Sequence, residues 1–365
     1  LVGSEMCIRD RIKNGQTKDN GGLITDHGSS SLTLGKLGTT KTIDISATSE
    51  SHALGITVMG PGNNKDYFGP TVNVNAEALK VRVEGKKDEG WAYGLHVANN
   101  STDAQTGKAT LNVHAQDIYV DAVGGVSSQA IALVAMSQGV MNLDGNLYVN
   151  TLGGNGRAIV ARGGAELNIN QSGKNTVVLN GDISFDYDAP TSGTPVDANV
   201  NIVLSGSNSS WTGNTLVSWD WGSKQPTDDE LALSVTGMKL TLEQGATWTP
   251  TVTPNDSTTE AIVGSKYVSL NSLNLDQGVI NVTGEDIDVT VEEMTGTGTV
   301  NLATDGSTAG RFNVENAAED ASLNINLMDT QLTRQLTADE INADQAKKLM
   351  DNVGGKDTEG NNIVS

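Results

Sequence analysis

Short alternations of apolar residues with asparagine recur along the chain, and this internal repetition constrains the fold more than any other feature. The clearest are Thr71-Val72-Asn73-Val74-Asn75 and Glu166-Leu167-Asn168-Ile169-Asn170, with related units at 110–113 and 140–143. Repeats of this kind are typical of architectures in which each unit packs only against its neighbours.

Two further strand-like runs follow a unit, as the units at 71–75, 110–113 and 140–143 show. They lie at 79–83 and 93–98, at 118–120 and 130–135, and at 147–149 and 157–161. Three short strands in a fixed order would make one coil of a solenoid. The sequence therefore predicts an all-β fold, a right-handed parallel β-helix (solenoid) with three short strands per coil.

The alternation also predicts which side chains are buried. Successive side chains of a strand point to opposite faces, so every second residue should enter the core. The apolar members of the asparagine units are expected inside, and the asparagines between them are expected to face outward as a stacked ladder. The expected core residues are Val72, Val74, Leu111, Val113, Met141, Leu143, Leu167 and Ile169.

Composition agrees with many short strands and argues against nucleic acid as a partner. The 365 residues include 42 glycines, but only 4% are aromatic and 18% charged, which favours strands broken by turns over a helical bundle. The formal net charge is −21, and an acidic chain repels phosphate backbones.

The ends of the chain differ in character from its middle. We expect residues 1–11 to be a non-native or disordered remnant, 12–330 to form the β-helix, and 331–365 to hold a short helix with a linker or insertion. Thr337-Ala338-Asp339-Glu340 reads as a capping box before a helix at 341–350, with Gly354-Gly355 as its stop, although a disordered polar tail is the alternative.

Two tryptophan-containing phrases suggest a family. Ser209-Ser210-Trp211-Thr212-Gly213 and Gly245-Ala246-Thr247-Trp248-Thr249 resemble a phrase common in pertactin-like and AIDA-like autotransporter passengers. The segments at 268–281, 296–302 and 310–314 are similar to that family in style, so the resemblance covers roughly residues 170–328. These motifs are structural, and they predict a fold rather than an activity.

The resemblance implies a passenger domain secreted by the type V pathway and displayed at the surface of a Gram-negative bacterium. The expected partner is a host or bacterial surface protein or glycan. The family anchors its passengers through a C-terminal β-barrel, and this sequence contains neither that barrel nor a signal peptide. We therefore expect a fragment that meets the outer membrane only through the missing barrel. The lone Cys7 cannot form an intramolecular disulfide, which agrees with export.

No catalytic motif is recognisable, and we expect neither an enzyme nor a cofactor or metal. The four histidines, His27, His52, His96 and His114, form no local metal or triad pattern, and His96 is expected to point outward from a strand. The carboxylate candidates for a glycan-cleaving enzyme are Asp186 with Asp188, Asp228-Asp229-Glu230, and Glu292-Glu293. Solvated acids in an acidic protein, or weak calcium ligands, are the alternatives.

The one candidate binding feature is the pair Trp219 and Trp221. In an extended loop both rings lie on one side, where they could form a platform for a sugar or a protein, or pack on the strands below. Trp211 and Trp248 are expected to be buried. The leading hypothesis is an adhesin-type passenger, and its rivals are a β-helical carbohydrate-active lyase or hydrolase and a purely structural stalk.

Overall fold

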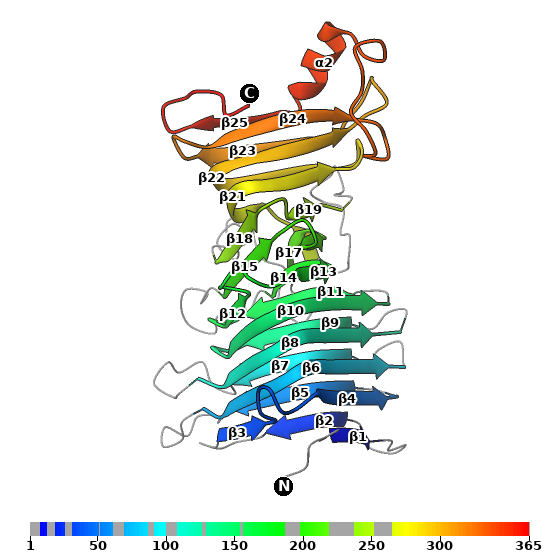
Figure 1. Ribbon diagram of the computed structural model, residues 1–365, viewed down its shortest axis with the longest axis vertical. Coiled ribbons are helices and arrows are strands. Elements are labelled where there is room, and N and C mark those ends of the chain that lie inside the picture. Colours follow the sequence, from blue (N-terminus) through cyan, green and yellow to red (C-terminus); the bar gives the residue numbers. More distant parts are fainter. Residues whose placement is uncertain are drawn as a thin grey trace.

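The computed structural model is an elongated all-β structure in which strands stack along the long axis (Figure 1). The residues that it describes are 8–12, 19–25, 31–50, 52–60, 69–86, 91–99, 108–125, 129–153, 156–186, 198–218, 237–251 and 265–364. Among them the strands form two sheets and one helix is present. No helix in those ranges has the length and apolar character needed to cross a membrane.

The larger sheet runs the length of the molecule and holds seventeen of the described strands, whose neighbours pair in parallel. Its strands are β1 (Ile8–Ile12), β3 (Ser31–Leu34), β4 (Thr42–Ser49), β6 (Thr71–Gly85), β8 (Thr110–Val123), β10 (Val140–Leu152), β12 (Glu166–Ile169), β13 (Val177–Asn180), β15 (Asn199–Ser205), β16 (Ser210–Thr212), β18 (Met238–Glu243), β19 (Thr247–Thr249), β21 (Leu270–Val282), β22 (Asp288–Ala303), β23 (Arg311–Ala317), β24 (Ser322–Met328) and β25 (Val353–Asp357).

The smaller sheet holds eight described strands, parallel except for its last pair, in the order in which the chain visits them. They are β2 (Asp19–Thr25), β5 (His52–Gly60), β7 (Trp91–Asn99), β9 (Gln129–Met136), β11 (Arg157–Arg162), β14 (Asp182–Asp186), β17 (Thr215–Ser218) and β20 (Ser265–Tyr267). The two sheets close around a common interior, so the cross-section is barrel-like.

The predicted right-handed parallel β-helix with three short strands per coil is therefore wrong. The strands belong to two sheets rather than three, and the first two strands predicted in each unit are one long strand. Residues 71–75 and 79–83, for example, both lie in β6, which then leads to β7 of the smaller sheet. A bend within one strand and a break between two strands look alike in the local sequence. The predicted number of strands per coil was wrong for this reason.

A β-bulge explains how one strand turns without leaving its ladder. The register between β8 and β10 shifts between Asp144 and Asn146, at Gly145. Gly145 has φ +151°, and a Cβ there would collide with the backbone oxygen of Ala115. Only glycine fits this close approach, so the polypeptide bends while its hydrogen bonds continue.

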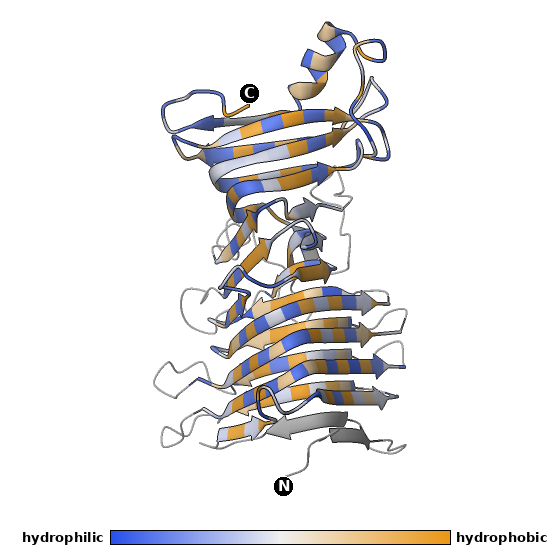
Figure 2. Ribbon diagram, viewed as in Figure 1, coloured by the Kyte–Doolittle hydropathy of each residue, from blue (hydrophilic) through white to orange (hydrophobic). Residues whose placement is uncertain are grey.

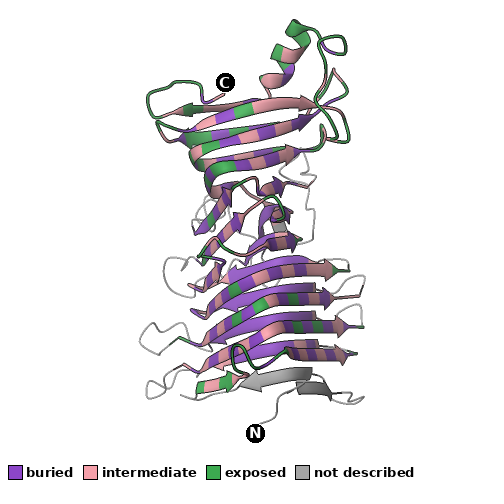
Figure 3. Cartoon of the chain, viewed as in Figure 1, coloured by how far each residue is buried: buried purple, intermediate pink, exposed green. Residues whose placement is uncertain are grey.

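The predictions of the core and of the asparagine ladder are confirmed. All eight expected core residues are buried, and hydropathy and burial alternate along the long strands (Figures 2 and 3). On the outside, Asn112, Asn142, Asn168 and Asn201 each donate from Nδ2 to the preceding ladder member, which begins at Asn73, over 2.8–3.0 Å. Each inner amide of the ladder donates to one neighbour and accepts from the other, which fixes the register of β6, β8, β10, β12 and β15.

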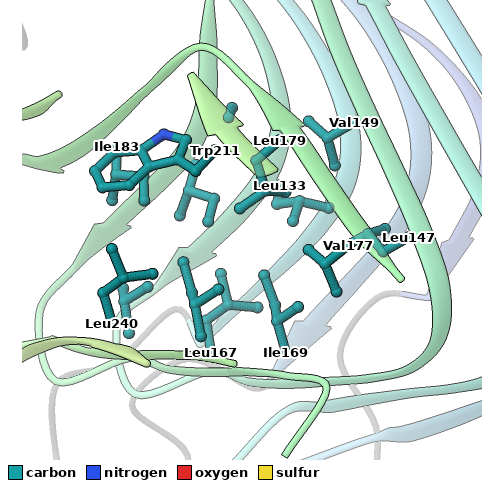
Figure 4. Close-up of a cluster of buried hydrophobic side chains, with 14 of the residues drawn as sticks. Leu133, Leu147, Val149, Leu167, Ile169, Val177, Leu179, Ile183, Trp211 and Leu240 are labelled. Atoms are coloured by element: carbon teal, nitrogen blue, oxygen red, sulfur yellow. The ribbon is translucent and has the colours of Figure 1, made fainter. Parts of the chain in front are cut away.

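The tryptophan phrases serve the core, as expected for Trp211 and Trp248. The two rings are in register on β16 and β19, stacked with centroids 5.3 Å apart and planes 6° from parallel. Their indole N–H groups donate to the carbonyls of Gly181 and Gly213 at 3.0 and 2.9 Å. Trp211 lies among aliphatic residues that include Leu179 and Ile183 (Figure 4). The phrases are therefore packing elements in this chain.

At the two ends, segments predicted to lie outside the repeat join the larger sheet. Residues 8–12 form β1, which pairs with β4, and β25 pairs with β23, so Gly354 and Gly355 are strand residues. The helix, α2 (Ala343–Met350), is capped by Asn342 and Gln345, which bond reciprocally. Thr337 and Glu340 instead close a separate turn before it, in which the Thr337 N–H donates to the Glu340 carboxylate at 2.9 Å.

Candidate functional site

The smaller sheet differs from the larger one because both of its faces are buried. In β9 every residue after Gln129 is buried, whereas burial alternates along β10. Leu95, Leu133 and Ile159 point into the main core. Their neighbours Tyr93, Ile131, Val134 and Val160 form a second cluster on the opposite face, called the outer face below.

Charged side chains lie on the same outer face, next to the end of the second apolar cluster. Parallel register places Tyr93 beside Ile131, Ile131 beside Arg157, and Arg157 beside Asp182. A second row runs from Thr57 through His96, Val134 and Val160 to Ser184. Met136 is followed by Arg162 in a third row. The polar cluster is defined here as Tyr93, His96, Arg157, Arg162, Asp182 and Asp186.

An ion pair lies at the centre of the polar cluster. Arg157 Nη1 is 3.6 Å from Asp186 Oδ1, and each side chain is only 1% exposed. The Ser184 hydroxyl also donates to Asp186 Oδ1, at 3.2 Å. Two buried opposite charges stabilise each other but leave a large penalty if either is removed alone. This pair therefore fixes the geometry of β11 against β14.

A second carboxylate, Asp182, begins the same strand as Asp186. Its Oδ1 accepts the backbone N–H of Asn214 at 2.8 Å, and its Oδ2 lies 3.5 Å from the Tyr267 hydroxyl. Burial raises the pKa of Asp182, although the Asn214 N–H and the charge of Arg157 oppose that rise. Burial and the adjacent carboxylate raise the pKa of Tyr267 to about 12, so this phenol remains a donor at neutral pH.

Tyr93 and His96 carry buried polar atoms that no described group satisfies. The Tyr93 hydroxyl, both ring nitrogens of His96 and the Thr57 hydroxyl have no hydrogen-bond partner among the described residues. Burial, and then the charge of Arg162, lowers the pKa of His96 to about 4. Burial, and then Asp186, raises the pKa of Tyr93. Both side chains are therefore neutral at pH 7, each able to donate and to accept.

A row of aromatic rings links this polar cluster to partly exposed positions. The rings of His52 and Trp91 are 3.9 Å apart between centroids, those of Trp91 and Tyr93 are 5.1 Å apart, and those of Tyr93 and His96 are 5.5 Å apart, edge to face. His52 and Trp91 are half-buried, whereas Tyr93 is 2% exposed. The aromatic row therefore leads from partly exposed positions to buried polar atoms.

The residues singled out from sequence fall in different places. Trp219 and Trp221 lie outside the described residues, as do His27, Asp188 and the acidic run at 228–230. Asp186 is part of the polar cluster, but as the buried partner of Arg157 rather than a solvated acid. Glu292 is on the larger sheet, where Asn271 donates to it at 2.9 Å, far from the polar cluster along the chain.

Two of the described histidines, His96 and His114, lie on different sheets. His96 does face away from the main core, but it is buried on the outer face. His114 is on the larger sheet with its Nδ1 4.0 Å from Asp144 Oδ2. In the ranges that the structure describes, no group of three or more histidine, cysteine, aspartate or glutamate side chains is placed to hold a metal ion.

Sequence reasoning missed most of the polar cluster. Arg157 and Arg162 bracket the apolar run Ala158-Ile159-Val160-Ala161, and Tyr93 and His96 interrupt another such run. A charged or polar residue within a continuous apolar strand was the available signal, because such a residue is buried on one face or the other. Alternation predicts that His96 points outward, but it does not show that the outer face is covered.

The chemistry that this arrangement allows is binding by stacking and hydrogen bonding. Asp182 and Asp186 face the same side of one strand, four residues apart, so their Cα atoms are about 13 Å apart. In comparisons with known proteins, no family model, no curated protein and no solved structure matches the chain.

Proposed function

We propose that this chain is a surface-presented binding protein of the adhesin kind, exported from a Gram-negative bacterium and in contact with a host or bacterial surface protein or glycan. The observation that carries the proposal is the outer face of the smaller sheet. There an aromatic row at partly exposed positions meets buried, unsatisfied polar atoms. Aromatic side chains beside a few convergent polar groups are the usual composition of a recognition site.

The scaffold suits presentation of such a site. Its strands stack along one long axis, and each pairs with neighbours through ladders such as the asparagine column. Stability in such a stack comes from contacts between adjacent strands. Acidic charge keeps an elongated protein soluble. The resemblance of the tryptophan phrases to autotransporter passengers supports export and display.

A binding experiment on intact surfaces tests the proposal. The purified chain, labelled with a fluorophore, is added to bacterial cells, cultured host cells and immobilised matrix proteins, and the bound label is measured against concentration. We expect saturable binding that excess unlabelled chain displaces. Binding that stays linear with concentration on every surface would contradict an adhesin role.

The DNA on either side of the coding region tests the export route separately. An autotransporter passenger should be continuous with a signal peptide upstream and an outer-membrane translocation segment downstream. A reading frame that contains neither would sink the autotransporter origin, whatever the binding experiment shows.

A glycan-cleaving enzyme is a second candidate, favoured by the perturbed pKa values in the polar cluster. The pKa of Asp182 is raised and that of His96 is lowered, both chiefly by burial, and such shifts gather at catalytic sites. Incubation with polysaccharides and measurement of reducing ends separates the two candidates. An activity that Asp182→Asn abolishes would favour the enzyme over the adhesin.

A further inference from the structure

We infer that the aromatic row and the polar cluster on the outer face of the smaller sheet form a site for a neutral saccharide. This inference rests on the proposed binding function and names its ligand class. It is carried by the line of rings from His52 through Trp91 and Tyr93 to His96, together with the polar atoms at the buried end of that line.

The unsatisfied atoms point to a ligand that is rich in hydroxyl groups. More than nine in ten buried polar groups in folded proteins have a partner, so several unsatisfied ones side by side call for a bound molecule or water. Thr57 and His96 are direct neighbours in the register between β5 and β7, and Tyr93 is on the same face of β7. Their atoms include both donors and acceptors, and a sugar hydroxyl can serve both.

The balance of charge favours a neutral ligand over an anion. Arg157 is paired with Asp186, and Arg162 and Asp182 add one charge of each sign. Tyr93 and His96 are uncharged at pH 7 because burial disfavours their charged forms. The cluster therefore has no net charge to attract a carboxylate or a phosphate, and the whole chain carries −21.

The aromatic row accounts for the remaining surface of such a ligand. A pyranose ring has an apolar face of C–H groups, which packs against aromatic rings, and hydroxyl groups at its rim. The rings of Trp91 and Tyr93 are tilted by 33° and belong to alternate residues on one face of β7. The rings of Tyr119 and Tyr148, on the larger sheet, are stacked with centroids 5.0 Å apart and planes 12° from parallel.

A glycan array followed by titration tests the inference. The wild-type chain is applied to a printed array of neutral glycans, acidic glycans and nucleotides, and the strongest neutral glycan is then titrated in solution by tryptophan fluorescence. We expect binding to neutral glycans, an affinity lowered at least tenfold by Trp91→Ala, and one lowered about fivefold by Tyr93→Phe, which removes a single hydrogen bond. Tyr119→Ala, an aromatic substitution on the other sheet, should leave the affinity unchanged.

Three other outcomes of this experiment would overturn the inference. A preference for acidic glycans or nucleotides, no binding to the array, or equal affinity of the wild type and Tyr93→Phe and Trp91→Ala variants would each do so. Circular dichroism confirms that the variants are folded, and Tyr93→Phe keeps the ring even if Trp91→Ala unfolds the chain. Saturable binding to cells without any glycan binding would contradict the saccharide site but not the adhesin role. Glycan binding without any cell or matrix binding would contradict the adhesin role but not the saccharide site.

Discussion

The two sheets share one interior but meet the outside in different ways. The larger sheet alternates buried and partly exposed residues, and its outer surface is stabilised by asparagine amides that bond along the stack. The smaller sheet is buried on both faces, and its outer face holds an arginine–aspartate pair and neutral polar groups that lack partners. Polar residues at similar strand positions therefore lower the stability of the fold little on the larger sheet and much on the smaller one.

The sharpest test of this contrast removes the same kind of residue from each sheet. Arg157→Ala removes the cation that pairs with the buried Asp186, and we expect it to lower the free energy of unfolding by about 3–5 kcal/mol. Arg311→Ala breaks the exposed pair with Asp288 on the larger sheet and should cost less than about 1 kcal/mol. Urea unfolding followed by circular dichroism measures both.

The double variant Arg157→Met, Asp186→Leu refines that comparison. Apolar residues of similar volume remove both charges, so most of the lost stability should return. Equal losses for Arg157→Ala and Arg311→Ala would contradict the distinction between the two sheets.

Protonation of His96 is expected to have an intermediate effect on the free energy of unfolding. Its pKa is about 4 in the folded chain against 6.5 ordinarily, so between these values the unfolded chain binds the extra proton. The free energy of unfolding should therefore fall as pH falls from about 6.5 to 4, by about 3 kcal/mol from this residue. His96→Leu should remove that share of the slope in urea unfolding at a series of pH values.

His114→Leu serves as the control for the pH experiment. His114 is half exposed on the larger sheet. This substitution also removes an imidazole, and it should leave in place the share of the slope that is assigned to His96. An unchanged slope in His96→Leu would mean that the outer face of the smaller sheet admits the charged imidazole.

The smallest effect is expected in the asparagine ladder. Asn142 donates to Asn112 and accepts from Asn168, at 2.8 and 2.9 Å, in a partly exposed column where water can replace each bond. Asn142→Ala should therefore lower the free energy of unfolding by about 1 kcal/mol. Asn313→Ala, at an exposed asparagine of β23, is the matched control and should be nearly neutral. A loss as large as that from Arg157→Ala would show that the two outer surfaces are alike.

The all-β character, the buried apolar positions and the outward asparagine ladder followed from the sequence by itself. Alternation is a local property, so Val72 and Asn73 could be assigned to opposite faces before any partner strand was known. Burial of Trp211 and Trp248 could be expected for the same reason. Export is a proposal that rests on the resemblance of the tryptophan phrases, and adhesion is a proposal that rests on the outer face of the smaller sheet.

Only the tertiary structure decided how many sheets there are and where polar side chains gather. A bulge at Gly145 keeps two predicted strands in one, because hydrogen bonds to β8 continue through the bend. The polar cluster joins β7, β11 and β14, whose residues Tyr93, Arg157 and Asp186 are far apart in the chain and meet only through parallel register and side-chain reach. Whether the outer face of a sheet is covered depends on how the sheets and the segments around them assemble. Alternation within a single strand therefore cannot predict it.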